Sequence, residues 1–273
     1  MRNKLFGALA IAALATTAFA GPAHAGETVT AGGASYTFAL QQVCTAAYTE
    51  HKVTYASVGS GAGKTNFRNG TYDFGGTDSL YSATEAKPSN FVYIPLLGGP
   101  VTLAYNLPGV TRLNLTPAII GAIYEGRITQ WNDKAIAAIN KTAKLPASAI
   151  VPVFRSEGSG TTFNFTNWLT QKKAGSFKAT DAFASSTTVV KGAIGSRGNS
   201  GVATSIASTQ GAIGYVDIAD ADKNKLTYAH VQNAAGQFIK PTVANSKLFI
   251  EKQLLKANGQ VVFDYNAKVR SEE

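Results

Sequence analysis

Residues 150 to 172 read IVPVFRSEGSGTTFNFTNWLTQK, and this stretch decides the fold class. Its first part, Ile150 to Phe154, is a short apolar run of the kind that forms a buried strand. The loop from Arg155 to Thr162 is rich in glycine and hydroxyl residues, and residues 161 to 172 place apolar side chains at helical spacing. This order of strand, loop and helix predicts an α/β unit whose loop can carry ligand-binding groups.

The same alternation extends to both sides of this stretch. Thr116 before Pro117 is a helix-start signal, and Gly126 follows the apolar positions as a stop. Strands that alternate with helices predict an α/β protein with a largely parallel sheet. Further strands are expected at residues 52–58, 91–94, 101–105, 213–216 and 225–231, a turn at 59–63, and further helices at 36–50 and 246–256.

Cys44 is the only cysteine, so the chain can form no internal disulfide. It shares the apolar stripe of the expected helix 36–50 with Leu40, Val43 and Ala47. We therefore expect the Cys44 side chain to be buried as a small apolar group and not to act as a nucleophile.

The N-terminus has the pattern of a signal peptide. Arg2 and Lys4 precede an uncharged run from Leu5 to Ala20, and small residues end at Ala25. A membrane anchor is the alternative, but the run is shorter than the roughly 20 residues that a spanning helix needs. The residue directly after the expected cut is Gly26 and not a cysteine, so we expect residues 1–25 to be removed and the protein to be periplasmic or secreted without a lipid anchor.

The net positive charge of the sequence favours anionic partners. Removal of Arg2 and Lys4 leaves 23 basic and 16 acidic side chains, a net charge of about +7. The lysines and arginines are scattered and form no run of five, so the composition does not predict nucleic-acid binding. A solvated basic surface explains most of this charge.

Residues 58 to 65, VGSGAGKT, resemble the phosphate loop of an ATPase only superficially. That loop needs a glycine five positions before Gly63, where this chain has Val58. The spacing fails by one residue, and an exported protein has no ATP to hydrolyse. We therefore expect the glycines to serve another purpose.

Four loops of small and hydroxyl residues combine features of an anion site. Three of them lead into an expected helix, whose first N–H groups bind anions, and Arg155 adds a cation that can make two parallel contacts. Taken singly, Ser35 or Thr161 could simply cap a helix. The loops are residues 31–36, 58–61, 73–79 and 155–162.

Together, and in this order, the loops resemble those of the periplasmic phosphate-binding proteins of ABC transporters. The motifs are Gly-Ala-Ser-Tyr, Val-Gly-Ser-Gly, Asp-Phe-Gly-Gly-Thr-Asp and Arg-Ser-Glu-Gly-Ser-Gly-Thr-Thr-Phe. Residues 195–201 and 211–216 extend the resemblance, which covers roughly residues 28 to 230. It implies a two-domain α/β clamp of the Venus-flytrap type that closes on inorganic phosphate and delivers it to an ABC permease.

The resemblance also implies domains and site residues. After the leader at 1–25 we expect a first α/β lobe at 26–104, and a second lobe with a truncated C-terminal segment at 105–273. We expect a monomeric binding protein, not an enzyme, with no cofactor or metal. Carried over by position, the phosphate-binding residues are Ser35, Tyr36 (through its backbone N–H), Ser60, Asp78, Arg155, Ser159, Gly160 and Thr161.

Asp78 takes the place of the carboxylate that senses a proton on the ligand. A carboxylate beside an anion is repulsive unless the anion donates a proton to it, which phosphate can do and sulfate cannot. An unpaired charged acceptor costs about 1 to 3 kcal/mol, so we expect tenfold to hundredfold selectivity. Asp73, by contrast, is expected to support its loop without contacting the ligand.

The sequence departs from the family pattern in three places. Ser35 and Tyr36 stand where Thr-Phe is usual, and Glu157 replaces an aspartate that orients the arginine, one methylene longer. The sequence also ends soon after the helix expected at 246–256, where the family continues with strands and a helix of the first domain. This leaves the completeness of the first lobe and competence for transport open.

Two other functions remain as alternatives. A secreted phosphate scavenger would use the same clamp without a permease. An exported phosphate-ester hydrolase is disfavoured, because His51 and His230 are the only histidines after the leader and no nucleophile elbow or metal helix is present.

Overall fold

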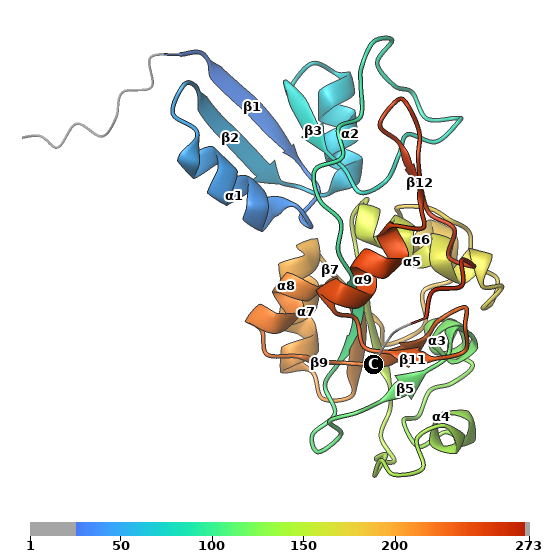
Figure 1. The fold of residues 1–273 in the computed structure, drawn as a ribbon. Coiled ribbons are helices and arrows are strands. Elements are labelled where there is room, and N and C mark those ends of the chain that lie inside the picture. The colour runs from blue at the N-terminus through green and yellow to red at the C-terminus, as the bar shows by residue number, and fades with distance from the viewer. Residues whose placement is uncertain (1–25, 271–273) are drawn as a thin grey trace, which may run out of the picture.

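The computed structural model describes residues 26–270, so the expected leader lies outside the described residues. At one end of the molecule a parallel sheet has the strand order β2–β1–β3 (Figure 1). We call this sheet and its two helices, residues 28–76, the first lobe. Its elements are β1 (Thr28–Gly33), α1 (Phe38–Ala47), β2 (Lys52–Ser57), α2 (Ser60–Arg68) and β3 (Phe74–Gly76).

A five-stranded sheet forms the centre of what we call the second lobe, residues 101–232, and its strand order is β7–β6–β8–β4–β9. β6 is parallel to β7 and β8, whereas β4 is antiparallel to β8 and β9. The strands are β4 (Val101–Tyr105), β6 (Val151–Arg155), β7 (Ile194–Ser196), β8 (Ala212–Asp217) and β9 (Thr227–Tyr228).

Helices of this lobe are α3 (Pro117–Tyr124), α4 (Lys134–Ala138), α5 (Gly160–Gln171), α6 (Phe183–Ser186), α7 (Gly198–Ser208) and α8 (Ile218–Lys223). A smaller sheet joins β5 (Asn114–Leu115), β10 (His230–Gln232) and β11 (Phe238–Ile239). α9 (Val243–Ile250) and the pair β12 (Leu254–Leu255) and β13 (Val261–Val262) follow.

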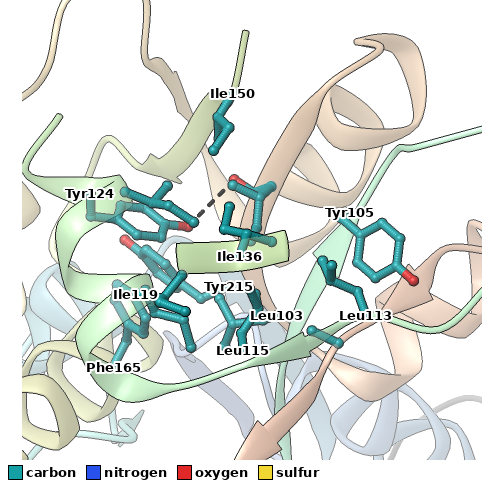
Figure 2. Packing of buried hydrophobic residues seen from close by; sticks show 14 of the residues in the cluster. Leu103, Tyr105, Leu113, Leu115, Ile119, Tyr124, Ile136, Ile150, Phe165 and Tyr215 are labelled. Atoms are coloured by element: carbon teal, nitrogen blue, oxygen red, sulfur yellow. Dashed lines mark hydrogen bonds between the residues drawn. The ribbon is translucent and has the colours of Figure 1, made fainter. Parts of the chain in front are cut away.

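The core of the second lobe contains aromatic rings packed against one another, both stacked and edge to face (Figure 2). The ring centroids of Phe165 and Tyr215 lie 4.4 Å apart, and those of Tyr124 and Phe165 lie 4.9 Å apart. Such pairs contribute about 0.5–1.5 kcal/mol each beyond the burial of their surface. The Tyr215 hydroxyl also accepts a hydrogen bond from the Arg155 N–H (3.0 Å). The core therefore fixes the end of β6, where the Arg155 loop begins.

Helix α3 shows how closely local signals can define an element. The Thr116 side chain accepts a hydrogen bond from the Ile119 N–H, Pro117 occupies the first turn, and Gly126 beyond the end has a φ of +72°. A threonine cap, an early proline and a glycine in the left-handed region are the expected start and stop of a helix. The prediction of this helix is confirmed.

Three expectations about local structure are wrong. Residues 91–94 form no strand, because no described strand runs beside them, and Val92 and Ile94 are exposed. The helix expected at 246–256 spans only Val243–Ile250. The Cys44 thiol is exposed, because nothing among the described residues covers the apolar stripe of α1.

Two further expectations change in detail. The turn expected at 59–63 is instead the start of α2, with Gly59 as its N-cap at a φ of +90°. The large sheet is mixed and not largely parallel. The chain passes from the first lobe into β4, and β4 runs antiparallel to β8. In residues 26–270 no helix has the length and apolar character to cross a bilayer.

Candidate functional site

The carboxyl ends of β1, β2 and β3 converge toward the second lobe (Figure 1). A Cβ added to Gly33, which has a φ of +142°, would lie 2.0 Å from the Gly76 carbonyl oxygen, so only glycine fits there. The Gly59 N–H donates to the Gly33 carbonyl (2.8 Å), and the Ala34 N–H donates to the Gly76 carbonyl (2.9 Å). The loops that follow these three strands are therefore held together by backbone contacts.

The two lobes touch through glycines. The Gly61 N–H donates to the Gly158 carbonyl (3.0 Å), and a Cβ added to Gly61 would lie 3.1 Å from the Gly158 Cα. The loop of residues 58–61 thus packs backbone against backbone on the Arg155 loop. The glycines of the quoted VGSGAGKT stretch provide this close approach.

Ser60, Asp78 and Gly160 form one contact across the lobes. The Asp78 N–H donates to the Ser60 Oγ (3.2 Å). A Cβ added to Gly160 would lie 2.5 Å from the Asp78 Cβ and 2.7 Å from the Ser60 Oγ. The Asn164 side chain donates to the carbonyl oxygens of Asp78 (2.8 Å) and Gly160 (2.9 Å) and so joins them.

Arg155 is buried, and every nitrogen of its guanidinium has a partner. Its Nε donates to the Glu157 Oε1 (2.9 Å), and its Nη2 forms an ion pair with the same oxygen. Its Nη1 donates to the Asn199 Oδ1 (2.9 Å) and lies 3.4 Å from the Thr161 Oγ1. The longer Glu157 side chain therefore still orients the arginine.

Burial would raise the pKa of Glu157, but the hydrogen bond and the charge of Arg155 outweigh it and lower that pKa. The Gly198 N–H, which also donates to the Glu157 Oε1 (2.8 Å), acts in the same direction. Glu157 is thus ionised at neutral pH, and its ion pair fixes the Arg155 guanidinium in place.

The first loop reaches the second lobe at the start of α7. The Ser35 Oγ accepts a hydrogen bond from the Asn199 N–H (3.2 Å). Burial, and then the charges of Asp217 and Asp78, raise the pKa of Tyr36. Asn199 thus connects Ser35 to Arg155, because its N–H donates to the Ser35 Oγ and its Oδ1 accepts from the Arg155 Nη1.

The start of α5 supplies free backbone donors. The Ser159 Oγ accepts from the Thr162 N–H (3.2 Å), so Ser159 caps this helix, and the Ser159 N–H donates to the Asp181 carbonyl (2.8 Å). The first N–H groups of a helix have no acceptor within it, which leaves those of Gly160 and Thr161 for a ligand. Ser159 itself keeps only its hydroxyl proton to donate.

The structure thus joins Ser60, Asp78 and Gly160 directly, links Ser35 to Arg155 through Asn199, and places the Thr161 hydroxyl against the Arg155 guanidinium. Tyr36 and Ser159 border the same group. Asn199 carries no role in the sequence analysis, although it lies within the matched motif of residues 195–201. Its side chain is buried, and its Nδ2, like the Glu157 Oε2, has no hydrogen-bond partner among the described residues.

Asp73 lies outside this group, as expected. Its Oδ2 accepts hydrogen bonds from the N–H (2.7 Å) and the hydroxyl (3.0 Å) of Thr30. These bonds lower the pKa of Asp73 and fix the loop to β1. In the part of the chain that the structure describes, no cluster of histidine, cysteine and carboxylate side chains could hold a metal ion.

Asp78 has an unusual acid strength. Burial raises its pKa to about 7, although the charge of Arg155 acts in the opposite direction. A carboxyl group with this pKa exists in both its protonated and its ionised form near neutral pH. It can therefore respond to whether a neighbouring anion carries a proton.

Replacing Asp78 with asparagine is expected to stabilise the ligand-free protein by about 1 to 4 kcal/mol at pH 8. The pKa of the Asp78 carboxyl rises from 3.8 to about 7 on folding. The free energy of unfolding therefore falls as the pH rises from about 3.8 to 7, because the buried group must ionise. Urea unfolding of both proteins from pH 4 to 8 measures the effect. The difference should grow up to about pH 7 and then stay level, and a difference that is independent of pH would contradict the assignment.

Two α/β lobes that meet at small-residue loops around one buried arginine have the architecture of a two-lobed binding protein, a class in which small ligands bind between domains. The chain belongs to the PBP superfamily, the periplasmic binding proteins, because the family model described as a PBP superfamily domain matches residues 17–266. The expected α/β binding-protein fold is confirmed.

Curated relatives are phosphate-binding proteins. PstS of Pasteurella multocida is 38% identical over 221 residues, which cover 79% of this chain and 64% of the relative. PstS of Xylella fastidiosa is 36% identical over 220 residues, which cover 78% of this chain and 60% of the relative. The chain therefore spans less than two thirds of the length of these relatives.

Solved structures show the same likeness. A high affinity periplasmic phosphate-binding protein (PfluDING) bound with phosphate superposes with a TM-score of 0.69 at 29% identity, over 84% of this chain and 69% of that one. A phosphate-binding protein from Stenotrophomonas maltophilia gives a TM-score of 0.60 at 25% identity, over 75% of this chain and 64% of that one. These relatives are binding proteins and not enzymes.

Proposed function

We propose that this protein binds inorganic phosphate between its lobes and delivers it to an ABC permease. The ligand would be held by Arg155, by the hydroxyls of Ser35, Ser60, Ser159 and Thr161, and by the backbone N–H groups of Tyr36, Gly160 and Thr161. The observation that carries this proposal is the position of Asp78, an acid with a pKa of about 7, between Ser60 and Gly160 and within the field of Arg155. The names of the relatives support the same ligand.

Asp78 would act as the acceptor for a proton that the ligand brings. Phosphate near neutral pH carries one or two protons and can donate one to the ionised Asp78 carboxylate. Sulfate carries none, so it would face a like charge without a hydrogen bond. Selectivity would then arise from repulsion of the wrong anion and not from tighter contacts to the right one.

The test is isothermal titration calorimetry with phosphate and with sulfate. The native protein should bind phosphate at least tenfold to hundredfold more tightly than sulfate at pH 8. Asp78→Asn should narrow this ratio toward one, and so should titration of the native protein at pH 5, because Asp78 is then protonated and can donate to sulfate. Equal affinities of the native protein for both anions at pH 8 would rule the role out.

Delivery to a permease is the further part of the proposal. It rests on the resemblance of the four loops to those of the binding proteins of ABC transporters, and a signal peptide at residues 1–25 would place a monomeric protein in the periplasm. Phosphate uptake by proteoliposomes that contain a phosphate permease should rise when the purified, phosphate-loaded protein is added. Binding without any stimulation of uptake would favour a scavenger, and turnover of a phosphate ester would favour a hydrolase.

A further inference from the structure

Lys64 is a buried cation that the phosphate site does not use. It lies one helical turn after Ser60 on α2, and only 4% of its side chain is exposed. Its Nζ lies 2.9 Å from the Glu85 Oε2 and 3.2 Å from the Asp181 Oδ2. Both carboxylates neutralise the lysine, which lies too deep to be hydrated and needs such partners.

The two carboxylates belong to different halves of the molecule. Glu85 lies on the first-lobe side: its Oε2 accepts from the Ser82 N–H (3.2 Å), and the neighbouring Tyr81 hydroxyl donates to the Lys64 carbonyl (2.7 Å). Asp181 lies between α5 and α6 of the second lobe, two residues before Phe183, which packs in its core. The pair of Lys64 and Asp181 therefore joins the lobes, whereas the pair of Lys64 and Glu85 does not.

Asp181 also connects directly to the anion site. Its backbone carbonyl accepts the hydrogen bond from the Ser159 N–H (2.8 Å), and Ser159 is the cap of α5. Lys64 shares the helix of Ser60, and Asp181 holds the helix start that contains Gly160 and Thr161. The ion pair between Lys64 and Asp181 thus adds a charged contact to those that position the first-lobe donors relative to the second-lobe donors.

We propose that Lys64 is a positioning residue that keeps the lobes closed on the anion and thereby sets its residence time. This inference rests on the proposed function. Opening the lobes would separate Lys64 from Asp181 while it stays paired with Glu85, so the ion pair adds to the barrier for release. Association begins from the open form and does not require the pair, so the effect falls on the dissociation rate.

Stopped-flow kinetics with inorganic phosphate test this proposal on the native full protein and five variants. Asp181→Asn removes only the pair between the lobes and should raise the dissociation rate about tenfold, with the association rate changed less than threefold. Lys64→Met should have at least the same effect, and the double variant should be no worse than Lys64→Met alone. Glu85→Gln removes an equivalent partner within one lobe and should have a clearly smaller effect than Asp181→Asn.

Arg68→Met is the control for loss of a positive charge from the same helix, since Arg68 is exposed and its Nε donates a hydrogen bond to the neighbouring Asn69. Its phosphate kinetics should match those of the native protein. Asp181→Asn with an unchanged dissociation rate would overturn the proposal, even if Lys64→Met fails to fold. Failure of the native protein to bind phosphate would overturn the proposed function together with it, so the two failures are distinguishable.

Discussion

Arg155→Met is expected to weaken phosphate binding about a thousandfold, or ~4 kcal/mol. Among the described residues of loops 31–36, 58–61, 73–79 and 155–162, Arg155 is the only cation, and its guanidinium is fixed by Glu157 and Asn199 at 2.9 Å each. Its removal takes away the charge that the anion would meet, and it leaves the Glu157 carboxylate unpaired beside the ligand. Loss of attraction and gain of repulsion act together, so we expect this to be the largest single-site effect.

Arg127→Met is the matched control for this substitution. Arg127 also forms an ion pair with a glutamate two residues away, Glu125, but 58% of its side chain is exposed. Exposed ion pairs contribute at most about 1 kcal/mol to the stability of the fold, so the Arg127→Met protein should remain folded. Its phosphate affinity should stay within twofold of the native value. Calorimetry on both variants, with circular dichroism to verify folding, makes the comparison.

The double variant Arg155→Met/Glu157→Gln separates the two causes. Removing the unpaired carboxylate should recover part of the affinity, about tenfold, while the missing cation keeps binding well below the native level. A folded Arg155→Met protein that binds phosphate within tenfold of the native one would show that the anion lies elsewhere.

The parts of the fold that the sequence predicted depend on signals close together in the chain. The cap at Thr116 and the stop at Gly126 act within ten residues, and the loop from Arg155 to Thr162 carries its own strand and helix on either side. Such signals are fixed by local hydrogen bonds and backbone conformation, which is why they can be recognised without the rest of the structure.

Long-range contacts decided what the sequence could not show. Residues 91–94 have the composition of a strand but lack a described neighbour to pair with, and strand formation needs that pairing. The antiparallel register between β4 and β8 joins residues such as Leu103 and Tyr215, which are far apart in the chain. Burial of the Cys44 stripe likewise depends on which elements cover α1.

The candidate site divides in the same way. The loop motifs indicated eight candidate residues by resemblance, and the structure brings Ser60 and Gly160 to Asp78, and Ser35 and Thr161 close to Arg155. Asn199 and the pair of Lys64 and Asp181 could not be predicted, because each depends on contacts between distant loops. Lys64 of the VGSGAGKT stretch illustrates this, since it forms ion pairs with Glu85 and Asp181, which are distant in the chain.

Gly160→Ala is expected to weaken phosphate binding about a hundredfold without destabilising the protein. Gly160 is the first residue of α5, where alanine is a better helix former by about 1 kcal/mol. Its new Cβ, however, would lie 2.5 Å from the Asp78 Cβ and 2.8 Å from the Asp78 carbonyl carbon. Carbon atoms need about 3.5–4.0 Å, so the lobes would have to separate by about 1 Å.

A separation of this size would lengthen the hydrogen bonds that donors from both lobes make to one small anion. Binding should therefore fall while the free energy of unfolding stays level or rises, a combination that ordinary damage to a fold does not produce. Gly201→Ala is the control, because that position lies early in α7 and its Cβ would meet ordinary contacts of 3.7 Å or more. Calorimetry and urea unfolding of both variants decide the matter: if Gly160→Ala binds phosphate within threefold of the native protein, the lobes do not close on the ligand as tightly as the contact between Gly160 and Asp78 requires.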